Sequence, residues 1–329
     1  MNKDIIGIDL GTANTNIYSS VSDSVIFSEP TVIALDSFTK EIKEIGFLAS
    51  RIQGKTPYNY IVKTPVENGL IDDEEACTLF LSKIFSQLKL TKAFKGTSLL
   101  FSAPSRCSQV NRNAIAQIGK DLAVREIFIE SQAKLAAIGA GENVYSPTGT
   151  LVCNIGAGIT DIAVISMGEV VNCGSTFIAG RTFDDAIRRY MIQKQHLSIG
   201  YKSAEYIKMR IGNLNPLSEN RLLEIKGRDT ITSLPSSMIV SSGEIRKVMA
   251  PLAEYLALKI TDVISMIQPE LSADILTNGL LLTGGGSLLQ GLKDILQSLL
   301  SIPVRVAEDP MEATSSGMRI FSQNLKKTK

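Results

Sequence analysis

The sequence predicts an α/β protein made of two related halves that face each other across a cleft. A Gly-containing hairpin pattern near the N-terminus, IIGIDLGTANTNIYSS, has a counterpart about 145 residues later, LVCNIGAGITDIAVIS. Strand-like and helix-like segments alternate after each hairpin, which is typical of α/β folds. A third Gly-rich turn, LLLTGGGSLLQGL, joins a strand pattern to a helix pattern near the end of the chain.

Length and composition indicate a globular protein with about two cores, since the chain has 329 residues. Hydrophobic residues make up 44% and charged residues 20%, which is ordinary for such proteins. Lys plus Arg (34) balances Asp plus Glu (33), so the net charge gives no reason to expect nucleic acid as a partner. A single histidine argues against a His-based metal site or a Ser–His triad.

The four cysteines form no CxxC pair, and three of them lie in or near apolar runs. We therefore expect buried free thiols in a reducing compartment. The N-terminus enters a strand pattern directly, without the basic and apolar regions of a signal peptide. No apolar run approaches the ~18 residues of a membrane span. Together these features predict a cytoplasmic protein.

The two hairpins align by their turns, which defines an internal repeat. Asp9 then falls opposite Asn154, Gly11 opposite Gly156, and Thr15 opposite Thr160. Each hairpin begins one half of the chain, and further strands and helices follow it.

Periodicity predicts the elements of the first half in order. Helical spacing after an acidic first turn favours a helix over 72–90. A buried strand over 96–105 ends near Pro104, a helix with a polar face follows over 108–121, a strand over 126–131, and a helix of small residues over 132–141.

The second half continues with the same alternation after its hairpin. We expect helix over most of 180–228, interrupted by the loop GNLNPLSEN, and a long amphipathic helix or helix pair over 241–268. Residues 275–300 predict a strand, a Gly turn and a helix, 302–309 predict a strand, and the last segment predicts a helix.

The chemistry of the three Gly-rich turns favours a phosphate ligand. Successive backbone N–H groups can converge on phosphate where Gly permits the geometry. One such turn would be weak evidence because many tight hairpins contain Gly, but two related turns in one chain strengthen it. The third turn would seat an adenosine, or it is simply a strand–helix turn. Asp9, at the end of a strand, would hold Mg²⁺ through water, or it caps the turn.

The motifs DLGTANTNIY, IGAGITDIAVIS, LTGGGSLLQGL and AEDP resemble, in this order, the phosphate-1, phosphate-2 and adenosine motifs and a C-terminal marker of the MreB family of bacterial actins. The resemblance covers essentially the whole chain. It implies an actin-like fold, two halves each with a larger and a smaller subdomain, and ATP or ADP with Mg²⁺ in the cleft. It places the first half at 1–145 (small subdomain about 33–65), rejoined by a C-terminal helix at about 313–329. The second half is placed at 146–312 (small subdomain about 180–240).

The resemblance also implies a set of ligand-binding residues. Asp9 and Asn154 would face the metal through water. In the helix SAEYIKMRIG, Glu205 and Lys208 stand at the nucleoside, although a solvated ion pair between them is an alternative. The nucleotide-binding turns are Gly11, Thr12, Ala13 and Asn14; Gly156, Ala157, Gly158 and Ile159; and Gly284, Gly285, Gly286, Ser287 and Leu288.

Three departures from the family pattern predict slow ATP hydrolysis and a divergent paralogue. The family usually reads DIGGGTTE where this chain reads NIGAGITD, so Asn154 replaces an Asp and Ile159 replaces a Thr. Gln132 stands where the family has its proposed catalytic Glu. Gln132 and Ile159 thus form a weakened water-positioning site, because an amide accepts no proton and an alkyl group makes no hydrogen bond. Eukaryotic actin also has Gln in the corresponding helix, so Gln132 alone would not abolish hydrolysis.

Two segments are candidates for membrane contact. Phe94 lies between Lys92 and Lys95, a pattern that suits an anionic surface, although Phe94 folded onto the core is an alternative. In the tail, Met318, Phe321 and Leu325 share one face and three lysines follow; that stripe either meets the membrane or packs on its own domain.

The resemblance implies head-to-tail filaments of the protein with itself, at the inner face of the cell membrane, that organise cell shape. Other MreB paralogues and membrane proteins are further expected partners. The alternative function is a small-molecule kinase of the same superfold, with Asp184 as its base. The other interpretation of Asp184 is that it caps a helix start or pairs there with another residue. A chaperone-like ATPase would need a C-terminal peptide-binding domain, which the sequence does not indicate.

Overall fold

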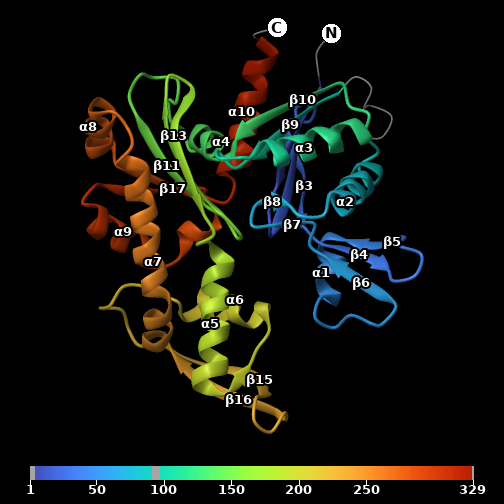
Figure 1. The fold of residues 1–329 in the computed structure, drawn as a ribbon, viewed down its shortest axis with the longest axis vertical. Helices are drawn as coiled ribbons and strands as arrows, with labels where there is room; N and C mark the ends of the chain where they lie inside the picture. Colours follow the sequence, from blue (N-terminus) through green and yellow to red (C-terminus); the bar gives the residue numbers. More distant parts are fainter. Residues whose placement is uncertain (1–3, 91–96, 328–329) are drawn as a thin grey trace.

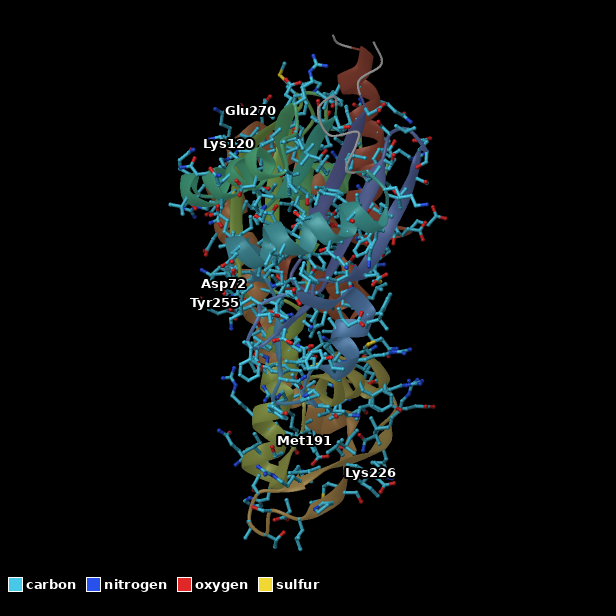
Figure 2. The ribbon with its side chains drawn as sticks, turned by 90° about the vertical axis from the view of Figure 1, so that its right-hand side faces the viewer. Asp72, Lys120, Met191, Lys226, Tyr255 and Glu270 are labelled. Atoms are coloured by element: carbon cyan, nitrogen blue, oxygen red, sulfur yellow. The ribbon has the colours of Figure 1, made fainter. Side chains whose placement is uncertain are left out.

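The computed structural model describes residues 4–90 and 97–327. Figure 1 shows two lobes, each with a larger sheet and a smaller one below it. Figure 2, turned by 90°, shows Lys120 and Glu270 toward one end of the elongated molecule and Lys226 toward the other.

The first large sheet grows outward from the N-terminal hairpin in the order β10-β9-β1-β2-β3. β1 runs antiparallel to β2 and parallel to β9. All six β9 residues are buried, as expected for a central strand covered on both faces. The strands are β1 (Ile5–Leu10), β2 (Asn14–Ser19), β3 (Ser24–Pro30), β9 (Ser98–Ala103) and β10 (Glu126–Ser131).

The second large sheet repeats this arrangement in the order β13-β12-β11-β17-β18. β11 runs antiparallel to β12 and parallel to β17, as β1 does to β2 and β9. Leu10 pairs with Thr15 and Ile155 pairs with Thr160, so the predicted alignment of the two turns is confirmed. The strands are β11 (Thr150–Ile155), β12 (Thr160–Ser166), β13 (Glu169–Thr176), β17 (Leu280–Thr283) and β18 (Val304–Val306).

The three helices predicted in the first half are confirmed, and each is one to five residues shorter than predicted. Asp73 caps α2 by accepting from the Ala76 amide, and Ser108 caps α3 in the same way. Phe80 and Phe85 of α2 are fully buried against the sheet. The helices are α2 (Glu74–Gln87), α3 (Gln109–Asp121) and α4 (Gln132–Gly139).

The second half differs from its prediction at residues 222–228, where a strand replaces the expected helix. This segment belongs to β15, which pairs antiparallel with β16. Ile225 is buried while its neighbours Glu224 and Lys226 are exposed, a period of two that marks a half-buried strand. The small sheet is β14 (Leu197–Ser198), β15 (Leu222–Asp229) and β16 (Pro235–Ser241).

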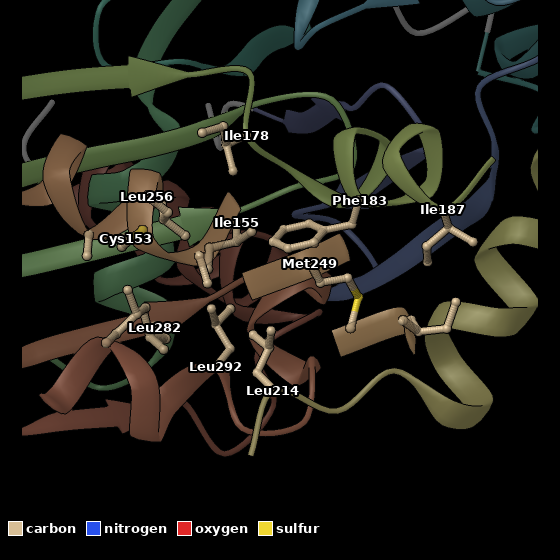
Figure 3. Packing of buried hydrophobic residues seen from close by; sticks show 14 of the residues in the cluster. Cys153, Ile155, Ile178, Phe183, Ile187, Leu214, Met249, Leu256, Leu282 and Leu292 are labelled. Carbon is tan, nitrogen blue, oxygen red and sulfur yellow. The ribbon is translucent and has the colours of Figure 1, made fainter. Parts of the chain in front are cut away.

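The helices of the second half pack on one large apolar cluster, and Figure 3 shows Phe183, Met249 and Leu282 from it. The segment 241–268 forms one helix, α7, that ends at Ile264, and 275–278 complete α8 before β17 begins. The helices are α5 (Gly180–Gln195), α6 (Tyr201–Ile211), α7 (Ser242–Ile264), α8 (Pro269–Asn278), the 3₁₀ turn η2 (Gly285–Leu288) and α9 (Leu292–Leu300).

A second small sheet, in the order β5-β4-β6, lies in the first half. The Lys202 ammonium of α6 donates to the Ser50 carbonyl of α1 at 2.6 Å, so the two small parts touch. The strands of this sheet are β4 (Ile33–Asp36), β5 (Ile42–Ile45) and β6 (Tyr60–Lys63), and α1 (Gly46–Ile52) follows β5. β7 (Val66–Glu67) and β8 (Leu70–Ile71) form a separate two-stranded sheet. The subdomain boundaries given above stay predictions.

The C-terminal helix, α10 (Ala313–Lys327), packs on α4, β1 and β2. Met318 is fully buried, and Phe321 and Leu325 pack beside it. The apolar stripe of the tail therefore packs on its own domain, which confirms that alternative over membrane contact.

The four cysteines are free thiols, as predicted, but only Cys77 and Cys153 are buried; Cys107 and Cys173 are half-buried. Within the described ranges, the structure contains no helix with both the length and the apolar character needed to cross a membrane.

Candidate functional site

The two predicted phosphate turns are built alike and meet between the halves. The Gly11 amide donates to the Asn14 carbonyl at 3.1 Å, and the Gly156 amide donates to the Ile159 carbonyl at 2.9 Å. A Cβ at Gly158 would lie 2.5 Å from Thr12 Oγ1, so glycine is required for this approach. The turns from β1–β2 and β11–β12 are thus in direct contact.

A side chain of the second half also reaches the first turn. Arg181, at the start of α5, donates from Nη2 to the Thr12 carbonyl at 3.0 Å. The α5 backbone follows the second turn closely, because the Gly180 and Arg181 amides donate to the Gly156 and Ala157 carbonyls. The start of α5 is therefore fixed to both turns.

The turn amides fit an anionic ligand. Among the hydrogen bonds of the described residues, none uses the amide N–H of Thr12, Ala13, Ala157 or Gly158. Such amides in Gly-containing turns form anion-binding concavities. The predicted phosphate residues are therefore brought together as two facing sets of donors.

Asp9 lies near the end of β1, directly before the first phosphate turn. Its Oδ1 accepts from Ser102 Oγ at 2.5 Å and from Gln132 Nε2 at 3.0 Å. Burial raises the pKa of Asp9, and the nearby Glu312 raises it further, so both favour the neutral carboxyl. A cation bound nearby would act in the opposite direction and favour the ionised carboxylate. In the described part of the chain, no three His, Cys, Asp or Glu side chains converge on a metal position. The cation that the sequence places at Asp9 through water stays a prediction.

Asn154 occupies a different environment from Asp9. It is buried at the end of β11, and its Oδ1 accepts from Thr283 Oγ1 at 3.2 Å. A Cβ at Gly284 would lie 2.6 Å from the same oxygen. The amide therefore contacts the third Gly-rich turn, a role that the sequence did not reveal.

Gln132 begins α4 and points its amide nitrogen at Asp9, which leaves its Oε1 as an acceptor for water. Ser131 caps this helix by accepting from the Lys134 amide at 3.1 Å. The structure thus brings Gln132 and Asp9 together, from segments 123 residues apart.

Asp161 is a site residue that sequence reasoning missed. It is fully buried on β12, yet its carboxylate accepts from the Ser105 amide (2.9 Å to Oδ2), the Ser105 hydroxyl (2.7 Å) and the Ala133 amide (3.2 Å). It joins the second hairpin to the N-terminus of α4. Burial raises the pKa of Asp161 to about 6, against the effect of these donors. The only sequence signal is a charged residue inside an apolar strand.

The third Gly-rich turn is held by the predicted C-terminal marker. The Gly284 amide donates to the Pro310 carbonyl at 2.7 Å, and Gly284 adopts φ +78°, which favours glycine. Ser287 Oγ donates to the Gly284 carbonyl at 2.6 Å. Gly285 and Leu288 are exposed, so part of the turn faces outward.

Lys208 does not form the ion pair with Glu205 that was the alternative to nucleoside contact. Its ammonium lies 2.8 Å from Asp184 Oδ1, an ion-pair distance without hydrogen-bond geometry, and donates to the Gly180 carbonyl at 3.0 Å. Glu205 is exposed. Lys208 pairs with Asp184 instead because α5 packs on α6 and places the buried Asp184 carboxylate beside Lys208. Burial raises the pKa of Asp184 to about 6, with Lys208 opposing.

The predicted membrane residues Lys92, Phe94 and Lys95 lie outside the described residues.

Comparisons with known proteins agree with this geometry. The family profile for the MreB/Mbl protein matches residues 3–329. The cell shape-determining protein Mbl of Bacillus cereus is 36% identical over 320 residues, covering 97% of this chain and 96% of that protein. The cell shape-determining protein MreB of Escherichia coli is 34% identical over 317 residues, covering 95% and 91%.

Solved structures are similar over the same length. The crystal structure of Spiroplasma citri MreB5 bound to AMPPNP superimposes with a TM-score of 0.94 at 34% identity, covering 100% of this chain and 98% of the other. The MamK double helical filament gives a TM-score of 0.79 at 18% identity, covering 98% and 99%, and shows the shared fold alone. The predicted actin-like fold is confirmed, and the chain belongs to the MreB/Mbl family.

Proposed function

We propose that this protein binds ATP or ADP with Mg²⁺ between its two phosphate turns and polymerises into filaments that organise cell shape. The proposal rests on the facing turns, in which four amides donate to no acceptor among residues 4–90 and 97–327. Support comes from relatives that are named cell shape-determining proteins and from the S. citri MreB5 structures bound to AMPPNP and to ADP.

On this proposal each turn has a defined task. The amides at Thr12, Ala13, Ala157 and Gly158 would hold the phosphates, and Asp9 would hold the metal through its water shell. The Gly284–Leu288 turn and Lys208 would contact the nucleoside. Mg²⁺ would supply charge neutralisation at the phosphates when it is bound.

Hydrolysis is proposed to be slow because the water-positioning groups are depleted. Gln132 can orient a water through Oε1 but cannot accept its proton, Ile159 presents an alkyl group, and Asn154 carries no charge. Each lost polar contact costs roughly 1 to a few kcal/mol in the transition state, or about tenfold to several hundredfold in rate.

A phosphate-release assay tests this. The Asn154→Asp, Ile159→Thr, Gln132→Glu triple variant should turn over ATP at least about tenfold faster than the parent. Equal rates would show that these positions do not limit hydrolysis.

The kinase alternative finds less support. Its proposed base, Asp184, is buried and paired with Lys208. ATP-dependent pelleting and light scattering distinguish the two functions, since a filament-forming protein sediments with ATP and a small-molecule kinase does not.

Membrane association at the inner face, through Phe94, Lys92 and Lys95, remains part of the proposal, as do paralogue and membrane-protein partners. Co-sedimentation with anionic liposomes should be reduced by Phe94→Ala. Deletion of the tail is expected to destabilise the fold instead, because its stripe is buried. No lipid dependence in the parent would remove this part of the proposal.

A further inference from the structure

The β7–β8 hairpin brings a tight turn of the first half against the second phosphate turn. Its strands pair Val66 with Ile71 and Glu67 with Leu70, which leaves Asn68 and Gly69 as a two-residue loop. Both loop residues have positive φ, +52° and +73°, as a type I′ turn requires. The loop geometry is therefore fixed by its own sequence.

This turn is tied to the first phosphate turn by a hydrogen bond. The Gly69 amide donates to Thr12 Oγ1 at 2.7 Å, and Thr12 is buried. On the other side, a Cβ at Gly158 would lie 3.0 Å from the Asn68 Cα. The Asn68–Gly69 turn thus contacts both phosphate turns.

Ile159 covers the same turn with its side chain. A Cβ at Gly69 would lie 2.3 Å from Ile159 Cγ2 and 3.0 Å from Ile159 Cβ, so the Cγ2 methyl rests directly on the Gly69 backbone. Only 7% of Ile159 is exposed. An apolar side chain from the second half is thus buried against backbone of the first.

We propose that Ile159 and the Asn68–Gly69 turn form an apolar seal that holds the phosphate end of the cleft closed and excludes water there. This rests on the proposed function, since the seal acts on a bound nucleotide. Opening the cleft would expose the Ile159 side chain to water, which opposes opening. Ile159 then has two separable effects: it lacks the hydroxyl of the family's Thr, and it closes the site.

Three substitutions at one position separate these effects. Ile159→Ala removes the Cγ2 methyl that rests on Gly69. Ile159→Val and Ile159→Thr each keep a methyl at this place, and Thr also restores the hydroxyl. The seal should respond to Ala alone, whereas hydrolysis should respond to Thr.

The first measurement needs no nucleotide. Amide hydrogen exchange at Gly69 should accelerate by at least about tenfold in Ile159→Ala and stay near the parent value in the Val and Thr variants. The second is the dissociation rate of a fluorescent ATP analogue with Mg²⁺, which should rise by a similar factor in the Ala variant only. Circular dichroism confirms that each variant is folded.

A reciprocal change tests the contact from the other side. Gly69→Ala should accelerate analogue dissociation, and Ile159→Ala in the same chain should recover part of the effect by removing the methyl that the new Cβ meets. Unchanged Gly69 exchange in Ile159→Ala would overturn the seal. A protein that binds no analogue in any variant would instead refute the proposed function, while Gly69 exchange still decides whether the contact exists.

Discussion

Replacing Gly317 by Ala tests the packing of α10 on α4, because two effects of opposite sign compete. Ala favours helix over Gly by about 1 kcal/mol, so propensity alone would stabilise α10. A Cβ at Gly317, however, would lie 1.8 Å from the Leu135 carbonyl oxygen and 2.5 Å from its carbon. Ordinary contact needs roughly 3.4 Å, so the helices must separate by about 1.6 Å, and backbone cannot avoid the clash by changing a rotamer.

The separation would also loosen the buried contacts beside it. Leu135 and Met318 pack in one cluster with Ile5 and Leu100, all buried. Overpacking costs about 1–3 kcal/mol, occasionally more, and the opposing gain of propensity subtracts about 1 kcal/mol. Because the overlap is with backbone, we expect the upper part of that range and a net loss of about 2 kcal/mol.

Urea and thermal unfolding of the parent and Gly317→Ala, followed by circular dichroism, measure this loss. Gly200→Ala is the matched control, since nothing lies within 4 Å of the added Cβ and its φ is −80°. A Gly317→Ala protein that is as stable as the parent, or more stable, would refute the close approach of the two helices.

Further predictions concern buried charges and the phosphate turns. The pKa of Asp161 is raised from 3.8 to about 6, so the folded state binds the Asp161 proton more tightly than the unfolded state does. The stability that this proton contributes is fully present below about pH 3.8 and is lost as the pH rises through about 6. The total loss is roughly 3 kcal/mol. The difference in unfolding free energy between the parent and Asp161→Asn, measured from pH 3.5 to pH 7, should follow this curve, and a flat difference would exclude it. Lys208→Met leaves the buried Asp184 carboxylate unpaired and should cost about 3–5 kcal/mol, which Asp184→Asn in the same chain should largely restore; additive losses in urea unfolding would contradict the pair. Gly158→Ala should force the phosphate turns apart, since its Cβ would lie 2.5 Å from Thr12 Oγ1, and should weaken ATP binding by about tenfold or more in calorimetry; parental affinity would count against the closed geometry.

Local patterns in the sequence predicted the frame well, because hairpin turns and helix caps depend on neighbouring residues. The paired turns, the helices α2 and α3, and the strand 126–131 belong to this class. The missed features depend on residues far apart in the chain. Residues 222–229 form the strand β15 because β16 pairs with them. Lys208 pairs with Asp184 because α5 packs on α6. No local pattern contains that information.

The second hairpin carries two of the three departures from the family pattern, Asn154 and Ile159, and these side chains and the neighbouring Asp161 each have a partner in the fold. Asn154 accepts from Thr283 beside the third Gly-rich turn, Ile159 rests on Gly69, and Asp161 holds Ser105 and the start of α4. None of these contacts requires a reacting water, and all of them fix the hairpin to neighbouring elements. If nucleotide binds this arrangement without rapid hydrolysis, its effect is that of a ligand that stabilises the closed state in proportion to its occupancy. A filament built from such subunits would then respond to the concentration of nucleotide more than to its turnover, and replacing ATP by a non-hydrolysable analogue should leave the extent of assembly unchanged.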